Sequence, residues 1–398
     1  MDLNVYERAI VNNADWFIAM EDERGFIAVP SDEYYGVPGD ASLIGHSMSV
    51  RTFAWYLTGD ERYLESARRS ARWLAERQDE RGGWRHDAGF ALDAAQCVME
   101  GFASLERLTG DRGFHEVLVK ATDRMISGTV RDDGQLLIGN LTECGEYAHF
   151  AFLAWRLTGL ERHLAGGHRI LEAITSQFDE EAGYWNTVGA IDVPKWMELS
   201  RFCLSPIVRA SVSRMQLKGK TVAKISELIM PLVINGRGPQ YALGMMDAES
   251  LLDTLDGRLE LPRLRQQVER GLRFVETYCA GPLAGSFCES RDVPASIAVY
   301  PLPAINDATN ASLWPTAATL LGYVGMQDPS YHERAKAVAD WLVSMQDDDG
   351  SFYTHQAPDG RRFGEKYGNI NFYGSVALWT YNAAVVRQTL HPTLFPAP

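Results

Sequence analysis

The stretch ADWLVSMQDDDGSFY, residues 339–353, runs an apolar helical stripe into a tight acidic turn that ends in Gly and an aromatic residue. Nearly the same stretch, ADWFIAMEDERGFI, occupies residues 14–27 near the other end of the chain. In both stretches a Gly follows the Trp by nine residues. Gly adopts the left-handed conformation that ends a helix at little cost, so the pattern predicts the same helix ending at both ends of the chain.

Further copies of this ending lie between the two. Trp73 stands nine residues before Gly82, and Met125 stands nine residues before Gly134. Looser copies follow near Gly183, near Gly285 and at 225–238. A second signal, Leu-Thr-Gly after an apolar segment, recurs within 55–67, 106–118 and 155–167. It predicts short turns between paired helices.

The two signals alternate with a period of roughly fifty residues, which indicates repeated helical hairpins. Such hairpins cannot bury an apolar face alone, so they stack on their neighbours. About six hairpins whose first and last copies match favour a closed ring over an open solenoid. No linker rich in Ser or Pro divides the chain. We therefore predict an all-α fold, with one (α/α)6-type toroid domain over residues 1–398.

Two known groups with this architecture are similar to the chain. The spacing Trp-x4-Gln-x3-Gly-x-aromatic, at Trp73 and at Trp341, resembles the repeat of squalene cyclases and prenyltransferases. The Leu-Thr-Gly-Asp turn resembles one carried by six-hairpin glycosidases, uronyl hydrolases, sugar epimerases and toroidal polysaccharide lyases. The segment 139–155 is similar to a helix of unsaturated glucuronyl hydrolases. No acid stands between Gly134 and Asn140, however, where those enzymes carry a catalytic Asp. The resemblance implies an α/α-toroid enzyme and leaves its activity open, because fold does not fix function.

Composition and charge narrow the range of partners. The formal net charge is −14, so the phosphates of a nucleic acid would be repelled and no nucleic-acid partner is expected. No stretch approaches about eighteen consecutive apolar residues, and the first residues lack the pattern of a secretory signal, so no membrane span or export is expected. The five cysteines form no CxxC pair and are expected to be free thiols. These features predict a cytoplasmic protein and leave its oligomeric state open.

The long segments after the Gly-aromatic turns are the expected location of the chemistry. They are rich in aromatic and polar side chains, whereas the Thr-Gly turns are short. In a toroid these segments would emerge at one end, over the N-termini of the inner helices, and function concentrates in loops held on a rigid frame. Aromatic rings with planar amides and carboxylates suit saccharides. The predicted substrate-binding residues are Tyr34, Tyr35, His46, Trp84, Asp93, Asn140, Trp185, Trp196, Arg291, Asn310, Trp314, Tyr353, Asn371 and Tyr373.

Acids in the same segments are candidates for catalysis, because glycoside hydrolysis uses a pair of carboxylates. We expect an acid near the start of the helix around 141–155 to work with an acid from another loop. The predicted catalytic residues are Glu143, Glu146, Asp40, Asp87, Asp307, Tyr367 and His149. Simpler roles stay open, since Asp40 and Asp87 would also serve as helix N-caps and His149 as a hydrogen-bonded core residue.

The leading functional prediction is a carbohydrate-active enzyme that cleaves a glycosidic bond of an oligo- or polysaccharide. A uronic-acid lyase or C5-epimerase is an alternative, because Tyr or His can remove the proton beside a carboxylate while Asn or Arg neutralises the charge. A class II terpene cyclase is a third interpretation. Such enzymes protonate an alkene with an Asp-rich motif, but the acidic cluster at 347–349 stands at a turn position of the repeat, where a structural role is expected. A non-catalytic glycan-binding toroid is a fourth. No spacing of Asp, Cys and His indicates zinc, so no metal or organic cofactor is predicted.

Overall fold

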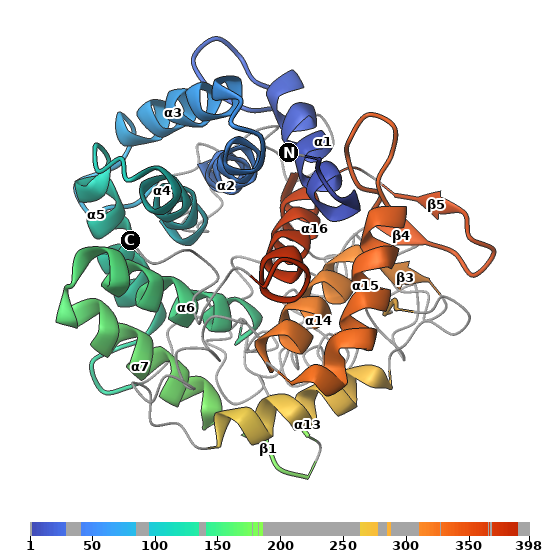
Figure 1. Ribbon diagram of the computed structural model, residues 1–398. Helices are drawn as coiled ribbons and strands as arrows, with labels where there is room; N and C mark the ends of the chain where they lie inside the picture. Colours follow the sequence, from blue (N-terminus) through green and yellow to red (C-terminus); the bar gives the residue numbers. More distant parts are fainter. Residues whose placement is uncertain are drawn as a thin grey trace, which may run out of the picture.

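The helices form a ring of two concentric layers (Figure 1). The computed structural model describes residues 2–28, 41–84, 95–134, 141–176, 178–181, 183–185, 263–277, 285–287, 310–326, 328–364, 366 and 368–388. The outer layer holds α1 (Val5–Ala19), α3 (Glu61–Ala75), α5 (His115–Thr129), α7 (Glu161–Thr175), α13 (Leu264–Glu276) and α15 (His332–Ser344). The inner layer holds α2 (Ala41–Thr58), α4 (Ala95–Thr109), α6 (Leu141–Thr158), α14 (Leu313–Gly325) and α16 (Gly368–Tyr381). The predicted all-α toroid is confirmed, whereas the single domain over 1–398 stays a prediction.

The two layers differ in how much of each helix they bury. The outer helix α3 buries Leu64, Ala67, Ala71 and Leu74 at steps of three and four residues, while Arg72 stays exposed. The inner helix α14 buries ten of its thirteen residues. An outer helix packs along one stripe, whereas an inner helix contacts neighbours on several sides, so the periodic pattern is clear in the first and weak in the second.

The Leu-Thr-Gly turns join each inner helix to the next outer one. At the end of α2, Gly59 has a φ of +70° and its N–H donates to the carbonyl of Trp55 at 2.7 Å. The Oγ1 of Thr58 then accepts from the backbone N–H of Asp60 at 3.1 Å. Thr109 and Thr158 accept the equivalent bond in the next two turns. Thr therefore closes the C-terminal end of one helix and orients the start of the next.

Two Gly-aromatic turns, those after α3 and α15, contact the outer helix that follows around the ring. The side-chain amide of Gln346 donates to the carbonyl of Gly350 in its own turn, at 2.9 Å, and to the carbonyl of Ala9 in α1, at 2.8 Å. Gln78 repeats this pattern with Gly82 and with Val117 of α5, at 3.2 and 3.0 Å. The shared spacing of these two repeats therefore encodes a contact between neighbouring hairpins.

The glycine of the last turn closes the ring. Gly350 has a φ of +88°, and a Cβ at this position would lie 2.2 Å from the carbonyl oxygen of Asn12 in α1. Gly82 approaches Lys120 of α5 equally closely. The last outer helix α15 thus meets the first outer helix α1 through the same turn that joins α3 to α5. The similarity of residues 14–27 and 339–353 is explained by this closure.

Polar side chains from the two ends of the described chain strengthen the same seam. Glu7 is buried and accepts both from Arg387, at 2.6 and 2.8 Å, and from Asn382 at 3.2 Å. Both partners lie at the end of α16, where a π-helical segment, η5 (Asn382–Val386), follows the helix. The hydrogen bonds to Arg387 hold the pKa of Glu7 below its ordinary value against the opposing effect of burial. A buried, satisfied carboxylate therefore fixes α1 to α16.

A second buried polar cluster connects the end of α1 to α2 and α3. Arg51 of α2 is fully buried and bonds to Ser66 and Ser70 of α3, at 2.7 and 3.0 Å. Glu21, in the turn after α1, lies 3.4 Å from Arg51 and accepts from Arg69 at 2.7 Å. Burial lowers the pKa of Arg51 to about 10, which still leaves it charged at neutral pH.

Short β-strands pair segments of the loops with one another. β1 (Phe178–Asp179) pairs antiparallel with β2 (Tyr184–Trp185), and β3 (Ala311–Ser312), β4 (His355–Gln356) and β5 (Arg362–Phe363) form a three-stranded sheet in that order. A 3-10 turn, η4 (Pro329–Tyr331), precedes α15. The sequence pattern did not predict these strands. They are two residues long and too short for an alternating pattern to show.

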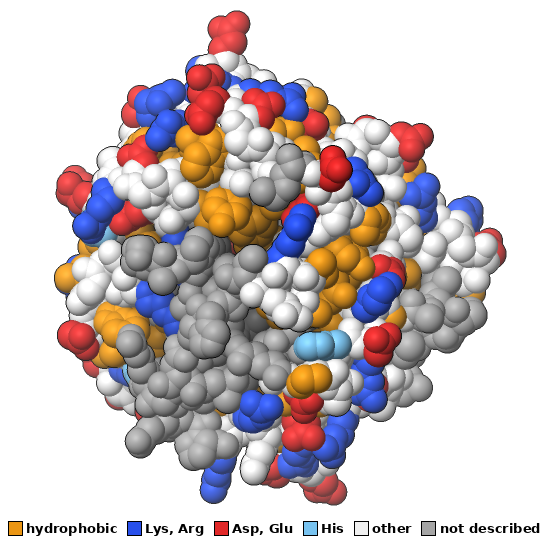
Figure 2. Space-filling view, viewed as in Figure 1, with side chains coloured by type: hydrophobic (Ala, Val, Ile, Leu, Met, Phe, Trp, Pro, Cys, Tyr) orange, Lys and Arg blue, Asp and Glu red, His pale blue; other side chains and the backbone are white. Residues whose placement is uncertain are grey.

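Charged side chains are dispersed over the outside of the ring. In the coloured part of the face shown in Figure 2, acidic and basic groups alternate around the rim. Pairs such as Arg62 with Asp15, at 2.7 Å, and Arg334 with Glu276 join adjacent outer helices. Among the described helices, none combines the length and apolarity that crossing a membrane would require.

Candidate active site

His46 of α2 and Glu100 of α4 form a buried pair in the inner layer. The Nε2 of His46 lies 3.8 Å from the Oε2 of Glu100, and the side chains are 4% and 9% exposed. Each is the sixth residue of its helix, so both lie in the second helical turn, toward the ends onto which the long loops lead. Glu and His are almost never buried in a protein interior without a partner or a task.

The pair meets because α2 and α4 approach each other closely. A Cβ on Gly101, next to Glu100, would lie 2.4 Å from the carbonyl oxygen of Gly45, next to His46. One turn further along, Ser104 donates to Ser49 at 3.1 Å between the same helices. Two glycines and a pair of small hydroxyl side chains therefore set the distance between the imidazole and the carboxylate.

Two aromatic rings of α16 contact the imidazole, and a third ring, from α14, lies next to one of them. Phe372 of α16 stacks on His46 with ring centroids 3.9 Å apart and planes 8° apart. Tyr373 meets the same imidazole edge-on at 6.0 Å, and Trp314 in the first turn of α14 lies 6.0 Å from Tyr373. Phe372 is buried, whereas Trp314 and Tyr373 are half-buried. The structure thus brings together three predicted substrate-binding residues, His46, Trp314 and Tyr373.

The inner helix α6 carries the next predicted residues. His149 is 7% exposed, and its ring centroid lies 5.2 Å from that of Phe150. Glu143 and Glu146 belong to the first two turns of α6, but their side chains lie outside the described part of the structure. The same holds for the side chain of Trp185 in β2. The backbone therefore places both acids at the start of an inner helix, and their roles stay predictions.

Many predicted site residues are not described at all. The following lie outside the described residues, and their roles stay predictions: Asp40, Asp87, Asp307, Tyr367, Tyr34, Tyr35, Asp93, Asn140, Trp196 and Arg291.

Three residues predicted to bind substrate make contacts within the scaffold instead. Trp84 is 4% exposed, and its indole N–H donates to the carbonyl of Leu74 at 2.8 Å. Asn371 is fully buried and its Oδ1 accepts from Asn13 at 2.9 Å and from the backbone N–H of Phe352 at 2.7 Å.

The third is Tyr353, whose hydroxyl donates to Asp347 at 2.9 Å in the turn that Lys366 also binds. These contacts hold turns and the seam together, so we leave the three residues out of the proposed substrate surface. Asn310, a fourth predicted substrate-binding residue, is 9% exposed and immediately precedes β3.

Glu100 is missing from the residues predicted from the sequence. The signal for it was present, because the segment AQCVMEGFASL (95–105) places a single acid within an apolar helix. An acid in such a setting needs a partner or a task. What the sequence does not contain is the identity of the partner, since His46 lies on a different hairpin.

His355 is a second buried imidazole, at the start of β4. It is 4% exposed, its Nδ1 lies 2.8 Å from the Oγ1 of Thr354, and its ring stacks on Phe363 at 5.5 Å. Its Nε2 is buried and has no hydrogen-bond partner among the described residues. Burial lowers the pKa of His355 from 6.5 to about 4, so the ring is neutral at pH 7.

This burial predicts a pH-dependent loss of stability. The unfolded chain takes up the proton first as the pH falls, because its imidazole keeps the ordinary pKa of 6.5. The contribution is therefore complete above pH 6.5 and is lost between pH 6.5 and about 4, by an amount on the order of 3 kcal/mol. Urea unfolding of the wild type and of His355→Phe at pH 7 and pH 4.5 measures it. The exposed His332→Gln serves as control, and an equal loss in all three proteins would contradict the assignment.

Among the described residues, no group of three or more His, Cys, Asp or Glu side chains is arranged to hold a metal ion.

The known proteins that resemble this chain are found among solved structures. No protein-family model matches the chain, and no curated protein matches it. Solved structures do match along nearly the whole chain. A D-mannose isomerase has a TM-score of 0.60 at 13% identity, covering 95% of this chain and 97% of its own. A polysaccharide lyase has a TM-score of 0.55 at 15% identity, covering 97% and 99%. An α-1,6-mannanase of Salegentibacter sp. HEL1_6 has a TM-score of 0.55 at 10% identity, covering 94% and 98%.

These identities are low, so the likeness shows the fold and not the activity. The chain shares its α/α-toroid fold with these structures, which confirms the toroid inferred from its repeats.

Proposed function

We propose that the chain is a saccharide-active enzyme that moves a proton at a carbon next to a sugar carbonyl, as an epimerase or an aldose–ketose isomerase does. The observation that carries this proposal is the buried pair of His46 and Glu100 in the inner layer, at 3.8 Å. The sequence alone favoured cleavage of a glycosidic bond, which needs two facing carboxylates. The described pair instead joins a carboxylate to an imidazole, which suits proton transfer near neutral pH.

In the proposed reaction the pair removes one proton from a carbon of the sugar, and one proton is returned to the sugar. One of the two groups, acting as base, removes the hydrogen from the carbon beside the carbonyl, and an enediol or enediolate forms. Return of a proton to the opposite face of the same carbon gives the epimer. Return of the proton to the former carbonyl carbon, with transfer of the neighbouring hydroxyl proton to the former carbonyl oxygen, gives the isomer. The ring of Phe372, stacked on His46 at 3.9 Å, holds the imidazole in one orientation and excludes water from its face.

Two further observations support a saccharide as substrate. Trp314 and Tyr373 are half-buried rings beside the pair, and aromatic side chains with a few polar groups are the usual lining of a small-molecule site. The D-mannose isomerase that the fold resembles acts on D-mannose, as its name states. This likeness supports the class of substrate, and the residues of the pair support the chemistry.

Cleavage of a glycosidic bond is the second candidate, because Glu143 and Glu146 lie in the first two turns of α6. An acid there, facing Asp40, Asp87 or Asp307, would supply the two carboxylates of a glycosidase.

A product screen separates the candidates. The protein is incubated with reducing mono- and disaccharides and with neutral and uronic-acid oligosaccharides, and the products are identified by proton NMR and near-ultraviolet absorbance. We expect an aldose to be converted into its epimer or ketose with no increase in reducing ends. New reducing ends without near-ultraviolet absorbance would indicate hydrolysis, and new reducing ends together with a new near-ultraviolet absorbance would indicate a lyase. Either outcome without epimer or ketose would refute proton transfer as the primary activity.

A further inference from the structure

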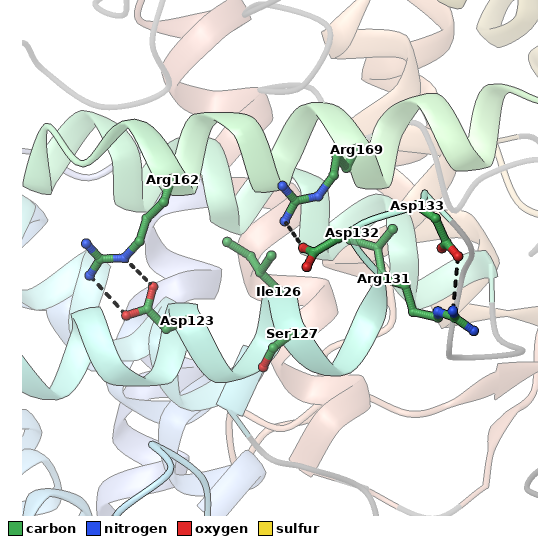
Figure 3. A pocket seen from close by; sticks show the side chains of 9 residues that line it. Asp123, Ile126, Ser127, Arg131, Asp132, Asp133, Arg162 and Arg169 are labelled. Atoms are coloured by element: carbon green, nitrogen blue, oxygen red, sulfur yellow. Dashed lines mark hydrogen bonds and ion pairs between the residues drawn. The ribbon is translucent and has the colours of Figure 1, made fainter.

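A cavity of about 570 Å³ opens in the outer layer between α5 and α7, and neither His46 nor Glu100 lines it (Figure 3). Arg162 and Arg169 extend into it from α7, and Arg131 reaches it from the turn after α5. Ile126 and Val130 give it an apolar surface. Its size falls within the range of small-molecule sites.

Two of the three arginines form short ion pairs within the protein. Arg162 binds Asp123 of α5 through two nitrogens, at 2.7 and 3.0 Å, and these bonds and that from His163 hold the pKa of Asp123 at about 2 despite its partial burial. Arg131 pairs with Asp133 at 3.1 Å. Arg169 differs from both, since its ion pair with Asp132 is 4.0 Å long and Asp132 is fully exposed. The Nε of Arg169 is buried and has no hydrogen-bond partner among the described residues.

The first repeat shows what such an arginine binds elsewhere in this chain. Arg62 and Arg69 are the second and ninth residues of α3, as Arg162 and Arg169 are of α7. Arg62 binds Asp15 of the preceding outer helix at 2.7 Å, which matches the pair of Arg162 and Asp123. The two interfaces are therefore built to the same plan.

The two interfaces differ in the partner of the ninth residue, which is Arg69 in α3 and Arg169 in α7. Arg69 donates at 2.7 Å to Glu21, whose side chain is 3% exposed and which stands five residues after Trp16. The equivalent position in the third repeat, five residues after Met125, is Val130. Within the described part of the structure, Arg169 therefore has no buried carboxylate like the one that its counterpart binds.

The backbone also leaves space there. In the first interface a Cβ on Gly25 would lie 2.4 Å from the backbone of Arg69, so the turn packs directly on α3. The equivalent Gly134, with a similar φ of +84°, has no atom of the described residues within 4 Å of such a Cβ. The turn after α5 thus stands away from α7, and the cavity opens in the interface where the first repeat buries its carboxylate.

We propose that this cavity binds the carboxylate of a small organic acid, of the size of a sugar acid, with Arg169 as its main hydrogen-bond donor. The guanidinium presents a planar set of donors that matches a carboxylate, as Arg69 does toward Glu21. The apolar surface of Ile126 and Val130 accommodates the carbon skeleton of the ligand. This site is independent of the activity proposed for the inner layer.

Titration calorimetry with D-glucuronate tests the proposal, with glucose and inorganic phosphate as comparison ligands. We expect glucuronate to bind the wild-type protein and to bind Arg169→Gln at least about tenfold more weakly, because a charged hydrogen bond is lost. Arg273→Gln, which removes an exposed arginine from α13, should bind as the wild type does. Val130→Glu should restore the internal carboxylate, raise the melting temperature and block glucuronate.

Four outcomes would overturn the proposal. They are no binding of glucuronate to the wild-type protein, equal binding by Arg169→Gln, equal binding of glucose, and tighter binding of inorganic phosphate than of glucuronate. If Val130→Glu does not fold, the comparison of Arg169→Gln with Arg273→Gln still decides between these results. None of these measurements depends on the enzymatic activity.

Discussion

Replacing Glu100 by Gln, or His46 by Gln, is expected to reduce turnover about 10²- to 10⁴-fold, the usual contribution of a general acid or base. Both substitutions keep a polar side chain of similar reach at a position in the second turn of an inner helix. The folded state should persist, as measured by far-ultraviolet circular dichroism. Initial rates on the sugar identified by the product screen give the loss of activity.

The same inner helix offers a matched control. Glu106, at the opposite end of α4, is also buried and lies 2.9 Å from His115. That pair lies at the end of the ring that carries the short Leu-Thr-Gly turns, next to the turn at 108–110. Glu106→Gln should therefore keep activity within about twofold of the wild type, since its carboxylate is far from the reacting groups. Full activity in Glu100→Gln, or an equal loss in Glu106→Gln, would remove the catalytic role of the inner pair.

The substitution Gly350→Ala should destabilise the protein strongly, because two effects add. The left-handed φ of +88° strains any residue with a Cβ by about 1–2 kcal/mol. The new Cβ would also lie 2.2 Å from the carbonyl oxygen of Asn12, which forces the turn away from α1 at a further cost of about 1–3 kcal/mol. Urea unfolding of the two proteins at the same pH measures the sum.

Gly134→Ala separates the two effects. Gly134 occupies the same position of the same kind of turn, and its φ of +84° is nearly equal. In the part of the chain that the structure describes, no atom lies within 4 Å of the place that a Cβ would take. It should therefore lose only the contribution of backbone strain. If both substitutions destabilise the protein equally, the turn at 347–350 does not pack tightly on α1, and closure of the ring would rest on other contacts.

The ring could be predicted from the sequence because its information is local and repeated. The Gly stop, the Leu-Thr-Gly turn and the helical stripe are each written within about fifteen residues and recur along the chain. The similarity of the stretches at 14–27 and 339–353 correctly indicated that the first and last outer helices are neighbours. The atoms responsible, such as the Gln346 amide that bonds to Ala9, became clear only in the structure.

The candidate site was predicted less completely, because it depends on contacts between hairpins. His46 was selected for its position after a long loop, but its partner Glu100 is set by the close approach of Gly45 and Gly101. Trp84 and Asn371 were selected by the same rule, yet their side chains hold the scaffold. Position in a segment indicates the end of the ring where a residue lies, whereas the direction of its side chain depends on packing that no local pattern records.

The outer cavity is a second feature that the sequence of a single segment does not reveal. Val130 is an ordinary apolar residue in its own segment, and its difference from Glu21 shows only when the ends of α1 and α5 are aligned on Trp16 and Met125. The comparison then shows one arginine with a buried carboxylate and its counterpart without one. Internal repeats can thus serve as their own reference when no relative supplies one.

Incorporation of deuterium from the solvent tests the central claim most directly, namely that His46 and Glu100 move a proton to and from a sugar carbon. The converted sugar is incubated in deuterium oxide and examined by proton and carbon NMR. The wild type and Glu106→Gln should place deuterium on the carbon beside the carbonyl, and Glu100→Gln should not. Turnover by the wild type that leaves this carbon free of deuterium, with new reducing ends in the product, would contradict the account.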